Sequence, residues 1–266
     1  MGCSRVSPGC DNCYAEALGK RTGLVQWGDD AERVITSDAY WLNPLKWNRA
    51  AEAAGKSASV FCASLADVFE DRTELVEPRR RLFKLIDQTP WLTWQLLTKR
   101  PENVMKMTTF WWWYTSPHNV WIGTTVEDQE RAEERIPHLL GIPASVRFLS
   151  CEPLLGPLDL SRWLGLRWVD AQRWQRLLSS PATGIGWIIV GGESGPGHRP
   201  LDLTHARDVV DQARSAYVPV FFKQVGGRTP KAGGDLLDGH QWKQFPLRSA
   251  PMAAKETARA ISARVD

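Results

Sequence analysis

The segment Val120-Trp-Ile-Gly-Thr-Thr-Val126 is a short run of apolar and β-branched residues, which predicts a strand. It is followed by a helical pattern over 127–140, interrupted near Pro137, and by a second strand-like run over 145–151. A strand, a helix and another strand in this order predict a parallel β/α/β unit. The fold class of the chain follows from the repetition of this unit.

The same alternation extends on both sides of the unit. A buried strand is predicted at 59–64, and further strands are predicted at 91–98, 186–192 and 219–225. The longest helices between them are predicted at 74–88 and 204–217. Right-handed crossovers would wind at least six such strands into a full or partial parallel β/α barrel of the TIM-like type. An open, doubly wound sheet is the alternative, although no glycine-rich nucleotide fingerprint opens the chain.

With 266 residues, the chain is long enough for one large α/β domain or two small ones. We assign residues 1–227 to a barrel domain, with an insertion near 157–183, where tryptophans interrupt the alternation. In 228–266, glycine, proline and polar residues dominate and basic residues are in excess, so we expect a loosely packed, basic tail. A helix is also predicted at 12–22 and a short strand at 33–37.

The composition is that of a soluble globular protein, with 43% hydrophobic and 24% charged residues. No apolar run is long enough to span a membrane and no secretory signal is present, so we expect a cytoplasmic protein without a membrane partner. The formal net charge of +3 does not indicate a large basic face for a duplex. It leaves open a nucleic acid or a nucleotide as partner, and the oligomeric state is undetermined.

A short loop at the start of the chain carries three cysteines, Cys3, Cys10 and Cys13. The C-x-x-C spacing of the second and third lets two sulfurs converge on one metal. The helix expected to start at this point has backbone N–H groups and a dipole that favour thiolate. A structural zinc or a sealed iron–sulfur cluster usually takes four protein ligands, so three thiols leave one metal position open. We therefore predict a three-thiolate iron–sulfur cluster.

The three cysteines are also compatible with two different kinds of site. A zinc ion could be completed by a distant histidine, or the thiols could form a redox site without metal. No fourth cysteine lies before Cys62 and no histidine before His118, which favours the open iron–sulfur site over a structural zinc site. Cys62 and Cys151 lie in apolar, strand-like runs and are expected to be buried thiols.

Polar residues follow the carboxyl end of every predicted strand. In a β/α barrel the active site lies at this end, so we expect these side chains to share one polar pocket. The candidates are Ser64, Asp67, Lys99, Arg100, Thr124, Glu152, Glu193 and Lys223. The alternative is that polar residues simply mark strand ends and cap the helices that follow.

Short motifs stand in order along the chain: Gly2-Cys-x6-Cys-x2-Cys-Tyr-Ala-Glu16, Ala63-Ser-Leu-Ala-Asp-Val-Phe-Glu70, Gln95-Leu-Leu-Thr-Lys-Arg-Pro101, Asn119-Val-Trp-Ile-Gly-Thr-Thr-Val-Glu-Asp-Gln129, Ser150-Cys-Glu-Pro-Leu-Leu-Gly-Pro157, Val190-Gly-Gly-Glu-Ser-Gly195 and Phe221-Phe-Lys-Gln224. Together they resemble a phage-derived three-cysteine-motif family of unknown function, over residues 2 to about 246. That family is similar in turn to radical S-adenosylmethionine (SAM) enzymes. Those enzymes hold a four-iron, four-sulfur cluster on three cysteines and build a partial β/α barrel.

The resemblance implies a radical-SAM-like enzyme, in which a cluster on the cysteine loop binds SAM, takes an electron from a donor and starts radical chemistry. The cofactor-binding residues would be Ser64, Asp67, Arg100, Thr124 and Glu152. The catalytic residues would be Lys99, Glu193 and Lys223. The phage context of the family suggests a nucleobase or DNA as the substrate. The rival hypothesis is a zinc-stabilised, non-enzymatic binding module that uses its tryptophan-rich segments, such as Trp111-Trp-Trp-Tyr114, as an interaction surface.

The sequence departs from the radical-SAM pattern in two places. The usual loop is C-x3-C-x2-C, whereas the first gap has six residues here. Members of the phage-derived family also carry a short stretch ahead of the first cysteine, expected to be the first strand of the barrel. Because this chain starts at Met1, two residues before Cys3, we expect that strand to be missing.

Overall fold

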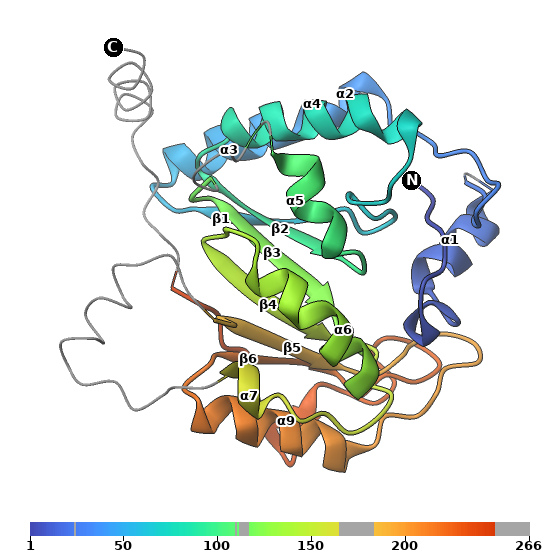
Figure 1. Ribbon diagram of the computed structural model, residues 1–266, viewed down its shortest axis with the longest axis vertical. Helices are drawn as coiled ribbons and strands as arrows, with labels where there is room; N and C mark the ends of the chain where they lie inside the picture. The colour runs from blue at the N-terminus through green and yellow to red at the C-terminus, as the bar shows by residue number, and fades with distance from the viewer. Residues whose placement is uncertain (24, 110, 112–116, 165–183, 248–266) are drawn as a thin grey trace.

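The computed structural model describes residues 1–23, 25–109, 111, 117–164 and 184–247. Six strands form one sheet in the order of the sequence, and each neighbouring pair is parallel. They are β1 (Ala58–Cys62), β2 (Leu92–Thr98), β3 (Val120–Thr125), β4 (Val146–Cys151), β5 (Trp187–Gly191) and β6 (Val220–Gln224). The sheet curls into a half-barrel, so the partial form of the predicted barrel is confirmed (Figure 1).

Helices connect the strands. The helices between strands are α4 (Val76–Asp87), α5 (Glu102–Thr108), α6 (Gln129–Leu140), α7 (Ser161–Leu164) and α9 (Leu203–Ser215), and those ahead of β1 are α1 (Tyr14–Thr22), α2 (Asp38–Trp41) and α3 (Asn43–Ala53). Side chains cap two of them, since Asp128 accepts from the Arg131 amide and Asp202 from the Thr204 amide. The interruption predicted at Pro137 is wrong: α6 continues through it. Its neighbours Ile136 and Leu139 are fully buried, and this packing offsets the backbone hydrogen bond that proline cannot donate.

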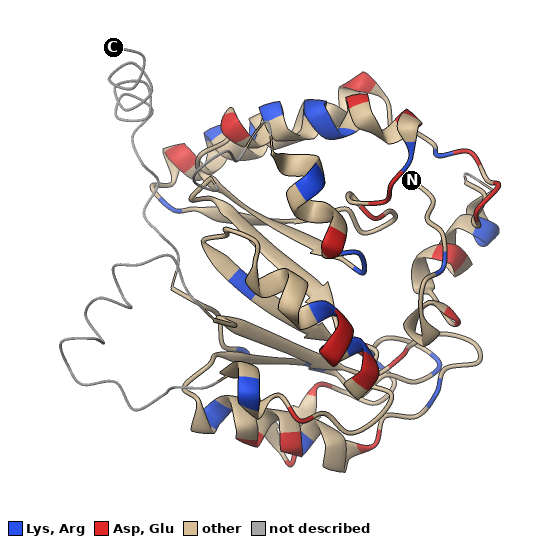
Figure 2. Ribbon diagram, viewed as in Figure 1, with Lys and Arg blue, Asp and Glu red and all other residues tan. Residues whose placement is uncertain are grey.

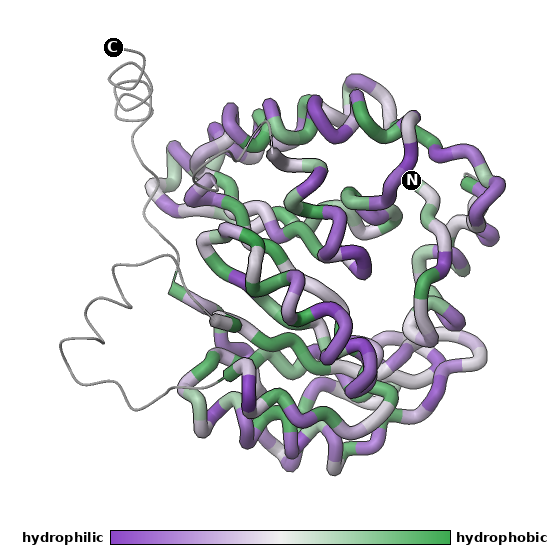
Figure 3. The backbone as a smooth tube through the Cα atoms, in the orientation of Figure 1, coloured by the Kyte–Doolittle hydropathy of each residue, from purple (hydrophilic) through white to green (hydrophobic). Residues whose placement is uncertain are grey.

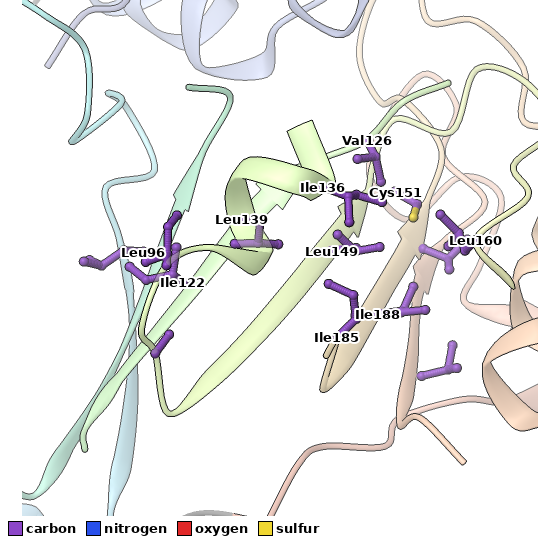
Figure 4. Packing of buried hydrophobic residues seen from close by; sticks show 14 of the residues in the cluster. Leu96, Ile122, Val126, Ile136, Leu139, Leu149, Cys151, Leu160, Ile185 and Ile188 are labelled. Atoms are coloured by element: carbon purple, nitrogen blue, oxygen red, sulfur yellow. The ribbon is translucent and has the colours of Figure 1, made fainter. Parts of the chain in front are cut away.

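The two faces of the sheet carry different cores because side chains alternate along a strand. On the face covered by helices, Leu96, Ile122, Leu149 and Ile188 pack against α6 and neighbouring segments (Figure 4). On the concave face, Trp121, Phe148 and Trp187 form a second cluster.

The hydropathy of the backbone follows the same division. Hydrophobic colour is concentrated on the strands, while hydrophilic and hydrophobic residues alternate along the helices (Figure 3). Gly123 lies in β3 beside Phe148 of β4, and the ring of Phe148 comes to 2.3 Å from where a Cβ on residue 123 would stand. Any larger residue at this position would displace that ring from the concave core.

Two segments differ from expectation. The segment 33–37 is not a strand: Arg33 is buried there and forms an ion pair with Glu70. Residues 228–247 are not a loose tail, because β7 (Leu236–Leu237) and β8 (His240–Gln241) form a hairpin and the Phe222 amide donates to the carbonyl of Trp242 at 2.8 Å. Residues 248–266 lie outside the described part of the chain.

The expected insertion and the tryptophan run are described only in part. Leu158, Leu160 and Leu164 are buried in the main core, so the first residues of the predicted insertion belong to the domain, while 165–183 lie outside the described residues. Trp111 stacks on Phe83 with ring centroids 4.1 Å apart, and the remaining residues of its run likewise lie outside the described ranges.

The first residues of the chain lie beside the continuation of β1. The Gly2 amide donates to the Leu65 carbonyl at 2.9 Å, and Gly2 forms a single parallel bridge with Ala66. Among the described residues, this single bridge and no strand precedes the cysteine loop. It lies at the position where the first strand of the resembled family would be expected. No helix within the described ranges is both long and apolar enough to cross a membrane.

Candidate functional site

The three cysteines of the N-terminal loop line one cavity of about 130 Å³ at the carboxyl ends of β1, β2 and β3. All three are free thiols and partly accessible. The loop passes through a single 3-10 turn, Pro8–Cys10, and Cys13 is the N-cap residue of α1. Cys13 therefore stands at the N-terminal end of a helix.

Four of the eight predicted strand-end residues line the same cavity, namely Ser64, Asp67, Lys99 and Arg100. Aromatic residues that the sequence did not single out also line it: Tyr14, Trp27 and Phe61. The Tyr14 hydroxyl donates to the Ser64 carbonyl at 2.9 Å and thereby connects α1 to the loop after β1. Figure 2 shows charged residues on the outer helices and the loops at the strand ends, while most of the sheet is uncharged.

A buried network, which we term the first anchorage, holds the beginning of the cysteine loop. Its members are Arg33, Asp67, Glu70 and Arg100. The Glu70 carboxylate accepts from the Ser4 amide at 3.0 Å and from Arg33 at 2.8 Å. Burial alone would raise the pKa of Glu70, but the hydrogen bonds from Arg33 and Ser4 hold it below its usual value. Glu70 is therefore an ionised, buried anchor for Ser4, which directly follows Cys3.

Asp67 joins the loop after β1 to the end of β2. It accepts from the Thr98 hydroxyl at 2.7 Å and the Lys99 amide at 3.1 Å. It also accepts from the Phe69 amide and the Arg100 guanidinium, each at 3.0 Å. Four protein donors therefore occupy the Asp67 carboxylate, which positions this part of the wall.

Arg100 connects this network to a cysteine. Its Nη1 lies 3.6 Å from Sγ of Cys3 and its Nη2 donates to the carbonyl of Ser4 at 3.0 Å. Burial raises the pKa of the Cys3 thiol to about 11, with a further contribution from the charge of Asp67 and an opposing one from Arg100. The Cys3 thiol is therefore the protonated form at neutral pH unless a metal binds its sulfur.

The middle of the loop rests on a second buried ion pair. The Gly9 amide donates to Oε1 of Glu127 at 3.2 Å, and Oε2 of Glu127 accepts from Arg135 at 2.9 Å. Glu127 is fully buried. A Cβ on Gly9 would lie 3.0 Å from Oε1, so glycine is what allows the loop to approach this carboxylate.

The end of the loop is held by what we term the second anchorage, Glu193 and Arg199. The Glu193 carboxylate accepts from Asn12 at 2.9 Å and from the Arg199 amide at 2.8 Å, and it also pairs with the Arg199 guanidinium. Arg199 in turn donates to the Pro8 carbonyl at 2.8 Å. Burial alone would raise the pKa of Glu193, but hydrogen bonds from Arg199 and Asn12 lower it. Glu193, predicted to be catalytic, thus supports the loop.

The other predicted residues lie away from the cavity. Glu152 and Lys223 form an ion pair at 2.8 Å that joins the ends of β4 and β6. Thr124 is fully buried, and its hydroxyl donates to the Thr98 carbonyl at 2.9 Å. Its neighbour Thr125 lines the cavity instead, with a buried hydroxyl that has no hydrogen-bond partner among the described residues. Because side chains alternate along β3, the concave positions 121 and 123 could have identified 125 as the inward threonine.

The donor set of the cavity has three thiols and no histidine. Across the described ranges, no three Cys, His, Asp or Glu side chains are grouped closely enough to hold a single metal ion. A closed zinc site requires four such ligands around one ion, whereas a multi-iron cluster is bridged by its own sulfides and spans more widely spaced thiolates. Three thiols that line one cavity are a donor set that such a cluster could use, and the described residues contain no assembled site for a single metal ion.

Comparison with known proteins identifies a family for this chain. The family model described as "Protein of unknown function (DUF5131)" matches residues 1–246. No curated protein and no solved structure matches the chain.

Proposed function

The chain belongs to this family of unknown function, and we propose that it is an iron–sulfur enzyme of the radical-SAM type. The observation that carries the proposal is the cavity at the carboxyl ends of parallel strands, into which three free thiols open without a fourth cysteine or a histidine among its lining residues. When bound, the cluster would pass one electron from an external donor to SAM, releasing methionine and a 5′-deoxyadenosyl radical that takes a hydrogen atom from the substrate.

The residues of the cavity divide into ligands and wall. Cys3, Cys10 and Cys13 would hold the cluster through their thiolates. Lys99 lies at the end of β2 and lines the cavity, and its ammonium group has no hydrogen-bond or ion-pair partner in the part of the chain that is described. We therefore assign Lys99 to the carboxylate of SAM, a role that an ammonium fulfils as a point charge.

The hydroxyl groups of Ser64 and Thr125 stand on the wall of the same cavity. The Thr125 hydroxyl is buried and unpartnered among the described residues, so it would gain a hydrogen bond from a polar group entering the cavity. We assign these two hydroxyls to polar groups of SAM in place of Thr124, whose hydroxyl is already bonded to the backbone of β2.

We assign Glu152 and Lys223 to substrate binding. Their ion pair is part-exposed at the ends of β4 and β6, on the same rim of the sheet as the cysteine loop. A bound substrate would replace this ion pair with contacts between its own polar groups and the two side chains. The free-energy cost of breaking the pair is small, because part-exposed ion pairs are weak. A nucleobase or DNA substrate rests on the sequence resemblance alone.

Anaerobic reconstitution with iron and sulfide, followed by an assay for 5′-deoxyadenosine, tests the proposal. We expect a brown protein with broad absorbance near ~400 nm that releases 5′-deoxyadenosine from SAM when a one-electron reductant is added. The matched control is Cys10→Ala, which should stay colourless and inactive. A wild-type protein that binds one zinc ion and no iron would contradict the proposal and favour the binding-module hypothesis.

A further inference from the structure

The three cysteines of the loop do not have equivalent surroundings. Cys3 has a guanidinium donor, Nη1 of Arg100, at 3.6 Å from its sulfur. Within the described residues, no nitrogen donates to the sulfur of Cys10 or Cys13. An N–H···S contact of this kind acts on one thiolate of a cluster and leaves the other two unchanged.

Arg100 is fixed in this contact by its other partners. Its Nη1 also donates to Asp67 at 3.0 Å, its Nη2 donates to the Ser4 carbonyl at 3.0 Å, and its backbone amide donates to the Thr98 hydroxyl at 2.9 Å. Arg100 is buried, and a second carboxylate, that of Glu70, lies 3.7 Å from Nη2. A planar guanidinium held from several sides cannot turn to a ligand in the cavity without leaving the buried Asp67 carboxylate without its ion-pair partner.

Hydrogen bonds to cysteine sulfurs and nearby positive charge are two of the factors that set the potential of an iron–sulfur cluster. Both stabilise the reduced state, because reduction adds negative charge to the cluster. On the basis of the proposed function, we propose that Arg100 is a positioning residue that raises the reduction potential of the cluster through its N–H···S contact with Cys3. It acts on the cluster and does not bind SAM, although the sequence resemblance places it among the cofactor-binding residues.

Arg5 provides a matched control. It lies in the same loop and close enough to Cys10 for an electrostatic interaction, but its guanidinium bonds to Glu16 at 2.8 Å. Its side chain is 51% exposed, so solvent screens its charge. Arg5→Met therefore removes one positive charge near the cluster without removing a donor to sulfur.

The test is a redox titration of the reconstituted proteins followed by electron paramagnetic resonance. For Arg100→Met we expect reduction to become at least about tenfold less favourable, which lowers the potential by about 59 mV for a one-electron couple. Arg100→Lys retains the charge with a different donor geometry and should shift the potential in the same direction by less. Arg5→Met should change it least.

Each outcome decides the inference. If Arg100→Met fails to fold, Arg100→Lys carries the test, and a potential no lower than that of Arg5→Met would overturn the proposal. Equal potentials in the wild type and both Arg100 variants would overturn it as well, while leaving the iron–sulfur function intact. A wild-type protein that takes up no cluster would overturn the proposed function itself.

Discussion

The two ends of the cysteine loop are attached by different kinds of contact. The first anchorage is an ion network in which Arg33 and Glu70 have side chains only 1% and 4% exposed. The second anchorage contains Arg199, whose side chain is 35% exposed, and its contacts include the backbone carbonyl of Pro8. The loop is therefore held by buried carboxylates at Ser4 and at Gly9, next to Cys10, and by a part-exposed arginine and the buried Glu193 at Asn12, next to Cys13.

This difference indicates which part of the loop can adjust when a metal binds. A buried ion pair is costly to break, because each partner left alone is an unpaired charge in a low-dielectric interior. A part-exposed pair can be exchanged for water at a small cost. We infer that the protein holds the loop in place from Cys3 to Gly9, while the segment around Asn12 and Cys13 adjusts when a metal binds.

The largest effect is expected from breaking the first anchorage. Arg33→Met leaves Glu70 without its main partner and should lower the free energy of unfolding by about 3–5 kcal/mol. Urea denaturation measures this value. The matched control is Arg80→Met, which removes an exposed pair with Glu77 and should have almost no effect. Equal stability of the two variants would show that the first anchorage contributes no more than a surface pair.

The next effect concerns the contact between the loop and Glu127. Gly9→Ala places a Cβ 3.0 Å from Oε1 of this buried carboxylate, so either the loop or the Glu127–Arg135 pair must move. We expect a loss of about 1–3 kcal/mol in the free energy of unfolding, as for other overpacked sites. Gly156→Ala is the control, because nothing lies within 4 Å of its Cβ position. A Gly9 variant as stable as the Gly156 variant would contradict the close approach.

A smaller effect is expected at the second anchorage. Glu193→Gln weakens the pairing with Arg199 and the hydrogen bond from Asn12, a loss on the order of 1 kcal/mol. Amide hydrogen exchange between residues 9 and 13 should then become roughly fivefold faster, while exchange in the strands stays unchanged. Glu152→Gln, which disrupts the pair with Lys223, should leave the loop amides as they are. Faster exchange across the whole sheet would mean that Glu193 stabilises the domain and not the loop.

The smallest effect is expected in the cavity between the anchorages. Thr125→Val removes a hydroxyl that has no partner among the described residues and should change the stability of the ligand-free protein by less than about 0.5 kcal/mol. Thr124→Val removes the donor to the Thr98 carbonyl and should cost about 1 kcal/mol. Urea denaturation of the pair separates them, and the reverse order would place the wrong threonine toward the cavity.

The sequence was sufficient to predict the positions of the six strands, because each is a short run rich in apolar and β-branched residues. Burial on both faces holds for β2 to β5, whereas the expected burial of the first strand is wrong: β1 is an edge strand with alternately exposed residues. The sequence was insufficient for Arg33, which looked like part of a strand. Its partner Glu70 lies 37 residues away along the chain, and no local sequence pattern predicts an ion pair across such a separation. The hairpin in 228–247 was missed for a related reason: its polar composition suggests a loose tail, while its order comes from contacts with β6.

The candidate site was predicted in part. The cysteines and four strand-end residues line one cavity, as the convergence of parallel strand ends implies. The sequence could not distinguish Thr124 from Thr125, since their orientation depends on the register of β3. It also could not show that Glu193 would be used to hold the loop, because Arg199 and Asn12 reach it only in the folded chain.

The central claim is that three thiolates hold one iron–sulfur cluster, and counting iron and sulfide in cysteine variants tests it most directly. After anaerobic reconstitution, the wild type and Cys62→Ser should each carry about four iron atoms and four sulfides per chain. Cys62 lies on β1 and is not among the residues that line the cavity, so it is not expected to be a ligand. Cys3→Ala, Cys10→Ala and Cys13→Ala should each lose the cluster. Full iron content in any of these three variants, or its loss in Cys62→Ser, would contradict the account.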